Sequence, residues 1–113
     1  ARASTWSRPG IFSPFSQDSG YYASKFFLSA QGISAAGLHE SHPLLVRTIQ
    51  AFQELADEVV VLVDSSKFSI RARHIAMPLA RVSTLITDDG ISGEDAEMLR
   101  AAGIKIVIAS LGN

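Results

Sequence analysis

The chain contains no cysteine, so neither a disulfide framework nor a zinc site with thiolate ligands can form in it. It has no apolar run of the ~20 residues that a membrane-spanning helix needs. The first residues include arginine and proline but no apolar segment of the kind found in a secretory signal. We therefore expect a cytoplasmic protein that makes no contact with a membrane.

Excess charge of one sign is also missing. The formal net charge is −1, and acidic and basic residues are interspersed along the chain. A surface that binds nucleic acid usually carries a clear excess of lysine and arginine. We expect no DNA contact by this chain itself.

What the chain has is apolar residues, which make up 47% of its 113 residues and suffice for the core of one domain. Residues 1–20 are rich in serine, with scattered aromatics and no regular hydrophobic period, and predict an irregular arm or linker. From residue 21 to residue 113, apolar runs alternate with amphipathic stretches. This second part predicts the folded domain.

The apolar runs predict strands, and the first of them is expected to be buried. Two amphipathic stretches predict helices, one starting near Ser41 and His42 and one capped by Ser92 and closed by Gly103. The stretch from Ser69 to Arg81 predicts a short helix and then an edge strand ending at Pro78. The expected strands are Lys25–Ser29, Val59–Val63, Thr84–Thr87 and Ile104–Ala109, and the first helix spans Leu44–Ala56.

The order strand, helix, strand, repeated twice, is typical of βαβ units with right-handed crossovers. The predicted fold class is therefore α/β, with a mostly parallel, Rossmann-like sheet and flanking helices. Ligands of such sheets bind beyond the carboxyl ends of the strands. Three strand-end loops are polar, namely residues 29–32, 64–67 and 87–90.

The second of these loops has the strongest chemical character. Asp64, Ser65, Ser66 and Lys67 follow the run of valines directly. Lys67 could contact a phosphate or a sugar oxygen, and Asp64 could accept hydrogen bonds from sugar hydroxyls or hold Lys67 in place. The same pair could also move protons in an aldose–ketose isomerisation. A plain solvated turn, in which Asp64 caps a helix, explains the pattern equally well.

Other polar groups favour structural interpretations. Asp88 and Asp89 precede Gly90 and are typical of a turn. His39 and His42 flank a carboxylate without a recognised metal-ligand spacing, and we expect them in an exposed loop. No glycine-rich phosphate loop or nucleophile elbow of a standard type occurs, so we expect no cofactor and no metal.

The segment from Val59 to Phe68, Val-Val-Val-Leu-Val-Asp-Ser-Ser-Lys-Phe, resembles the signature strand and turn of the carboxyl-terminal sensor domain of the DeoR family of transcriptional repressors. The flanks agree in order: Lys25–Leu28 with Gly32 and Ile33 before it, and Leu85–Asp88 after it. The resemblance spans about residues 21–109. It implies a fold similar to that of sugar-phosphate isomerases.

The resemblance also implies a function. Proteins of this family repress genes of sugar catabolism until a phosphorylated sugar binds the sensor domain. Asp64, Ser66 and Lys67 would then contact the effector, with Gln31, Gly32 and Asp88 at neighbouring strand ends. No counterpart of the family's winged helix-turn-helix, or of the Asp-Ser-Gly-Thr-Thr phosphate loop in the first half of the sensor domain, is recognisable. We therefore expect an incomplete effector-binding domain whose sheet edge is covered in a homo-oligomer.

Two alternatives stay open at this point. The chain could be an enzyme of the isomerase class, or a dimerisation fragment that binds no ligand.

Overall fold

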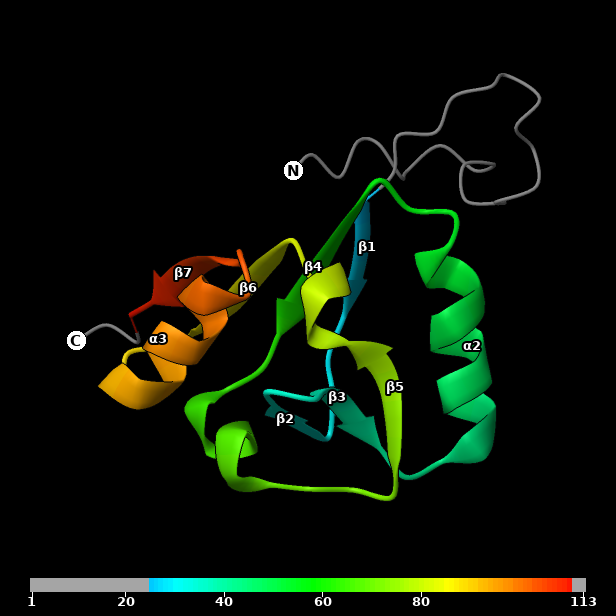
Figure 1. The fold of residues 1–113 in the computed structure, drawn as a ribbon, viewed down its shortest axis with the longest axis horizontal. Coiled ribbons are helices and arrows are strands. Elements are labelled where there is room, and N and C mark those ends of the chain that lie inside the picture. The colour runs from blue at the N-terminus through cyan, green and yellow to red at the C-terminus, as the bar shows by residue number, and fades with distance from the viewer. Residues whose placement is uncertain (1–24, 111–113) are drawn as a thin grey trace.

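A computed structural model describes residues 25–110, which form two β-sheets and two α-helices (Figure 1). The larger sheet has four strands in the order β1-β4-β6-β7, and all neighbouring pairs are parallel. Its elements are β1 (Lys25–Leu28), β4 (Glu58–Leu62), β6 (Thr84–Asp88) and β7 (Lys105–Ala109), with helices α2 (Pro43–Gln53) and α3 (Gly93–Ala101). The predicted α/β class with a mostly parallel sheet is confirmed.

A second, antiparallel sheet lies between β1 and β6 in the chain and was not predicted from the sequence. It has three strands in the order β2-β3-β5. Their bounds are β2 (Gly32–Ser34), β3 (Gly37–Glu40) and β5 (His74–Pro78). The residues expected to form only a loop at Gly32 therefore begin a hairpin. The edge strand expected to end at Pro78 is confirmed, but it belongs to this second sheet.

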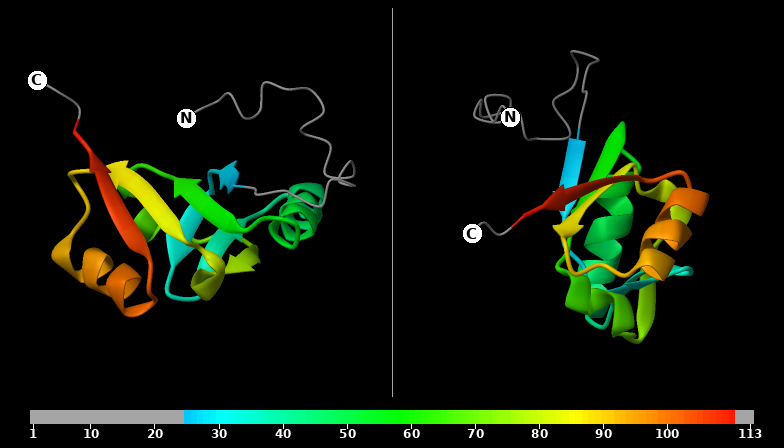
Figure 2. Two further views of the ribbon diagram at one scale, coloured as in Figure 1. Left: turned by 90° about the horizontal axis from the view of Figure 1, so that it is seen from above. Right: turned by 90° about the vertical axis from the view of Figure 1, so that its left-hand side faces the viewer.

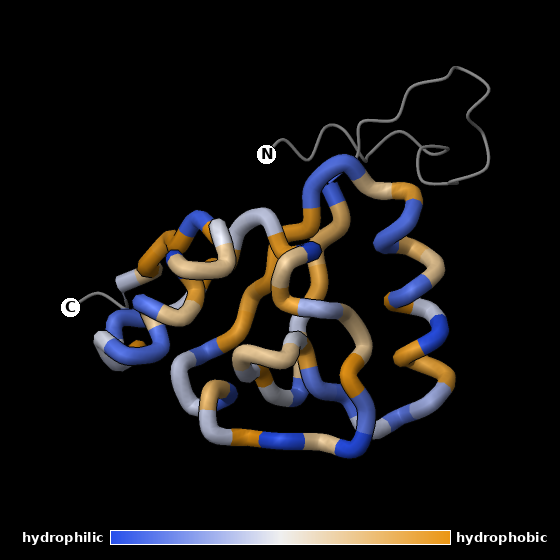
Figure 3. Tube along the Cα trace, viewed as in Figure 1, coloured by the Kyte–Doolittle hydropathy of each residue, from blue (hydrophilic) through white to orange (hydrophobic). Residues whose placement is uncertain are grey.

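Two short 3₁₀ helices complete the fold, η3 (Ser65–Ser69) and η4 (Leu79–Arg81). The short helix expected after Ser69 thus lies earlier, directly behind Asp64. Figure 3 shows a largely hydrophobic β4 that becomes hydrophilic at this turn. None of the helices within residues 25–110 is long and apolar enough to cross a membrane.

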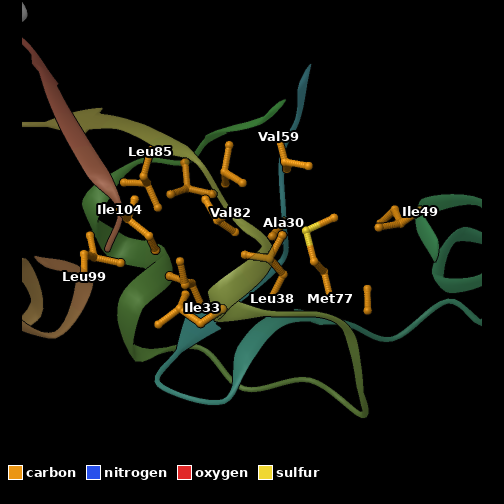
Figure 4. Close-up of a cluster of buried hydrophobic side chains, with 14 of the residues drawn as sticks. Ala30, Ile33, Leu38, Ile49, Val59, Met77, Val82, Leu85, Leu99 and Ile104 are labelled. Atoms are coloured by element: carbon orange, nitrogen blue, oxygen red, sulfur yellow. The ribbon is translucent and has the colours of Figure 1, made fainter. Parts of the chain in front are cut away.

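One face of the parallel sheet carries the core. Val59, Val61 and Leu85 belong to one buried cluster with Leu99 of α3 and Ile49 of α2 (Figure 4). Residues of the hairpin and β5 complete the cluster, including Ile33, Leu38 and Met77. Because the strand order follows the chain order, right-handed crossovers bring every connection to this same face. Figure 2 shows the helices and the hairpin together on one side of the sheet.

The opposite face is bare within the described part of the chain. The register aligns Phe27 with Val60, and Leu62 with Ile86 and Val107, on this outer face. Phe27 is 58% exposed, Leu62 43% and Val107 37%. The expectation that Lys25–Ser29 is a buried strand is wrong, because β1 is an edge strand and half of its side chains point to this uncovered side.

Helix α2 also differs from its expected environment. His42 caps it, with its side chain accepting a hydrogen bond from the Leu44 amide at 3.2 Å. Of the helix, Ile49 is buried, whereas Leu44 and Phe52 are 59% and 40% exposed. Phe52 contacts Phe26 of β1 with ring centroids 5.6 Å apart. The apolar face of α2 is thus wider than the part of it that packs against the core, and its margins stay exposed.

Gly32 is required by a close approach between the hairpin and the chain after η3. A Cβ atom at position 32 would lie 2.0 Å from the carbonyl oxygen of Ile70. We expect Gly32→Ala to lower the free energy of unfolding by roughly 1–3 kcal/mol, because backbone must move to admit the methyl group. Urea unfolding measures the loss. The matched control is Gly93→Ala, whose methyl group would meet nothing within 4 Å, and equal stability of the two variants would contradict this account.

Candidate functional site

The turn after β4 is organised around the carboxylate of Asp64. Asp64 has an extended backbone and caps η3 by accepting the Ser66 amide at 2.9 Å. The same carboxylate accepts the Ser66 hydroxyl, and its Oδ2 lies 3.0 Å from Lys67 Nζ. A short polar segment directly after a buried strand folds in this way because the cap satisfies the free amides of the first helical turn.

These donors change the ionisation of Asp64. Hydrogen bonds from the Ser66 hydroxyl, from Lys67 and from the Ser66 amide lower the pKa of Asp64 from its usual value near 3.8 to about 2. The carboxylate is therefore charged at neutral pH, and it holds the ammonium group of Lys67 at the protein surface. Lys67 keeps 31% of its side chain exposed, so the ammonium retains donors that face solvent.

Asp88, at the end of β6, lies beside this turn. Its Oδ2 accepts the Ser65 amide at 3.0 Å, and its Oδ1 accepts the Gly90 amide at 2.9 Å. The pKa of Asp88 is lowered by hydrogen bonds from the Ser65 amide, the Ser65 hydroxyl and the Gly90 amide, and the negative charge of Asp64 opposes this effect. Parallel strands end at the same edge of the sheet, which brings the two carboxylates together.

A shallow depression of about 380 Å³ lies at this edge of the sheet. Its walls come from the carboxyl ends of β4, β6 and β7, and they are largely apolar with the two carboxylates at the rim. The lining residues are Leu62, Val63, Asp64, Ile86, Thr87, Asp88 and Ala109. Its volume is in the range of small-molecule sites, and its position is the one expected for ligands of parallel sheets.

Two residues of this edge were not singled out from the sequence. The Ser65 amide links the turn to Asp88. Thr87 is only 3% exposed, and its hydroxyl oxygen has no hydrogen-bond partner within the described residues. The sequence did hold a signal for Thr87: it is a polar residue on the inner face of β6, where Leu85 is apolar. Nothing in the sequence signals a backbone donor such as that of Ser65.

Gln31 and Gly32 lie at the end of β1, as expected, but their contacts are made within the fold. Gln31 Oε1 accepts the amide and the hydroxyl of Ser41, both at 2.9 Å. Gly32 is buried and close to the Ile70 carbonyl. The structure therefore groups Asp64, Ser66, Lys67 and Asp88 in one cluster, whereas Gln31 forms hydrogen bonds with Ser41 and Gly32 packs against Ile70.

The histidines expected in an exposed loop have defined structural contacts. His39 is only 6% exposed, so that expectation is wrong for this residue. Its Nε2 lies 2.9 Å from the Ser34 hydroxyl, and its Nδ1 lies 3.1 Å from the Ala72 amide, which donates to it. His42 is exposed and caps α2. The imidazole of His39 thus links β3 to the end of β2 and to the segment before β5.

Comparison with known proteins identifies the family. The model of the DeoR C terminal sensor domain matches residues 15–89, about two thirds of the chain. The chain belongs to this family. Residues 15–89 contain β4, the Asp64 turn and all of β6, so the match includes the cluster described above.

Individual relatives are transcriptional regulators. The HTH-type transcriptional regulator UlaR of Shigella dysenteriae serotype 1 is 31% identical over 96 residues, which are 84% of this chain and 38% of the relative. A putative aga operon transcriptional repressor of Escherichia coli O157:H7 is 34% identical over 55 residues, 49% of this chain and 20% of the relative. The chain thus spans well under half the length of these relatives.

The lowered pKa of Asp64 predicts an acid-dependent stability. Because the folded-state pKa lies below the unfolded one, ionised Asp64 stabilises the fold above about pH 4, and this contribution is lost as the pH falls toward about 2. Asp64→Asn retains a capping oxygen but cannot titrate. We expect its urea midpoint to fall less than that of the wild type between about pH 6 and about pH 2.5. If the urea midpoints of the two proteins fell in parallel with pH, the hydrogen bonds to Asp64 would not lower its pKa in the folded state.

Proposed function

We propose that this chain is the effector-binding region of a transcriptional regulator of sugar metabolism, and that its effector is a phosphorylated sugar. The observation that carries the proposal is the cluster at the carboxyl edge of the sheet, where Asp64 and Asp88 line an apolar depression and Lys67 forms an ion pair with Asp64. Membership of the sensor-domain family supports the regulatory role. Relatives named as a transcriptional regulator and an operon repressor support it further.

The chemistry of the cluster suits a ligand with an anionic end and several hydroxyls. The partly exposed ammonium group of Lys67 can donate a hydrogen bond to a phosphate oxygen. Carboxylate oxygens accept hydrogen bonds from sugar hydroxyls, and Asp64 is 55% exposed at its side chain. The apolar walls of the depression can receive the carbon face of a sugar ring.

The ionisation of Asp64 favours binding without turnover. A general base is most effective when its pKa lies near the working pH. Asp64, with a pKa of about 2, is a weak base, and its oxygens already accept hydrogen bonds from Ser66 and Lys67. This argues against the isomerase alternative. We also propose that the chain works in the cytoplasm and that DNA contact is made outside it, in keeping with its net charge of −1.

Calorimetric titration with a panel of sugar phosphates, each paired with its unphosphorylated sugar, tests the proposal. We expect saturable binding of at least one phosphorylated member and weaker binding of its partner sugar. Lys67→Ala should weaken the binding of the phosphorylated member by roughly 1.5–3 kcal/mol, the value of a hydrogen bond to a charged group. Incubation with the bound sugar phosphate, followed by NMR, should show no isomerised product.

The control variant is Lys105→Ala. Lys105 is an exposed lysine at the start of β7, at the opposite edge of the sheet, and its loss should leave the affinity unchanged. Equal losses in both variants would indicate non-specific attraction of an anion. No binding across the panel would leave the non-binding dimerisation fragment as the better account.

We further propose that a second copy of this chain covers the outer face of the parallel sheet. Sheets of parallel strands are normally covered on both faces. In this sheet, the helices and the other described connections between the strands all lie on the inner face (Figure 2). The outer face carries an apolar row that crosses the sheet through Phe27, Val60, Leu62, Ile86 and Val107. Its charged residues lie at the two edges: Lys25 pairs with Glu58 at 3.7 Å at the amino-terminal edge, and Asp88, two residues after Ile86 in β6, accepts the Ser65 and Gly90 amides at the carboxyl edge. Such a face can pack against its own copy without burying an unpaired charge.

Light scattering after size exclusion measures this association. We expect the wild type to form a dimer or a larger oligomer, and Phe27→Lys to shift it toward the monomer because a charge would enter the apolar row. Leu44→Lys is the control, since Leu44 is 59% exposed on α2 and away from this face. A monomeric wild type, or a Phe27→Lys variant that associates as before, would contradict the proposal.

A further inference from the structure

The two strand-end loops of the site are joined by a single side chain. Ser65 is the first residue of η3, and its amide donates to the Oδ2 atom of Asp88, at the end of β6, over 3.0 Å. The other oxygen of Asp88 holds the Gly90 amide of its own loop at 2.9 Å. The loops are also in direct contact, because a Cβ at position 90 would lie 2.7 Å from the Ser65 hydroxyl.

This geometry gives Asp88 a different task from that of Asp64. Both of its carboxylate oxygens accept backbone amides, one from each loop. Two charge-assisted hydrogen bonds fix the direction of a carboxylate more firmly than one. The Asp88 residue is only partly exposed, whereas the Asp64 side chain is 55% exposed.

We propose that Asp88 is a positioning residue that orders the turn from Asp64 to Lys67, and so sets the affinity for the ligand without touching it. The inference rests on the proposed sugar-phosphate site. It is an alternative to the simpler expectation that Asp88 is a ligand contact like Lys67, and the two expectations predict different results. Because Asp88 acts on the turn through the Ser65 amide, removing either partner of that hydrogen bond should have the same consequence.

Ser65 offers a way to remove the donor while Asp88 stays intact. Proline has no amide hydrogen and is well tolerated at the first position of a helix. The residue before it must be extended, and Asp64 already has φ −84° and ψ 165°. Ser65→Pro therefore deletes the hydrogen bonds from the Ser65 amide and hydroxyl to Asp88 in a backbone that already suits proline. Ser65→Ala, which removes the hydroxyl alone, separates the two donors.

The experiment is a double-mutant cycle on sugar-phosphate binding with Asp88→Ala, which removes both accepting oxygens, and Ser65→Pro. Each single variant should weaken the binding about tenfold, the effect of losing one hydrogen bond to a charged group. The double variant should also be weakened only about tenfold, because both changes remove the same interaction. Asp89→Asn is the control: Asp89 is exposed and makes no side-chain hydrogen bond within residues 25–110, so its affinity should equal that of the wild type.

Other results would overturn the proposal. If Asp88 contacted a sugar hydroxyl directly, Ser65→Pro would have little effect and Asp88→Ala would weaken binding in either background. If Asp88 faced the phosphate, Asp88→Ala would strengthen binding, because a repelling charge is removed.

Amide hydrogen exchange of the ligand-free protein separates this inference from the proposed function. We expect the Ser66 and Lys67 amides, which bond to Asp64 at 2.9 and 3.0 Å, to exchange at least several-fold faster in both single variants and unchanged in Asp89→Asn. If the wild type binds no sugar phosphate, the proposed function fails, and faster exchange still supports the ordering role of Asp88. Unchanged exchange at Ser66 and Lys67 overturns that role whatever the ligand does.

Discussion

The packing of β4 against the single core is the constraint on which the rest of the structure depends. Val59 and Val61 are fully buried, and the cluster around them includes residues from both helices, the hairpin and β5. β4 also lies between β1 and β6 in the parallel sheet. Its carboxyl end therefore has a fixed position beside that of β6, and the separation between Asp64 and Asp88 follows from the strand register and not from either loop alone.

The sequence predicts well those elements whose signals are local. β4 and β7 contain continuous apolar runs, and β6 is a short run of β-branched and apolar residues closed by a turn signal. Ser92 caps α3 by accepting the Asp95 amide at 3.0 Å, and the helix ends before Gly103 with φ +83°. The hairpin of β2 and β3 is too short to show a period of two. The exposure of Phe27 also cannot be predicted from the residues around it, because it depends on which face of the sheet the connections between the strands cover.

The site shows the same division between local and distant information. Asp64, Ser66 and Lys67 are adjacent in the chain, so their grouping is predictable, and the cap geometry confirms a local turn. The link from Asp88 is made to a main-chain amide 23 residues away, and a backbone donor is the same at every residue type except proline. Sequence reasoning could place Asp88 near the site, but the direction of its side chain required the structure.

The depression and the outer face of the sheet share residues, and this joins ligand binding to assembly. Leu62 and Ile86 belong to the apolar row of the outer face and also line the depression. A molecule that covers the row therefore changes the exposed surface, and with it the hydration, of the depression proposed as the ligand site. By linkage, any preference of the ligand for the covered or the uncovered form equals the effect of the ligand on association. The shared side chains of β4 and β6 are therefore the place where the proposed ligand and the proposed second copy would meet.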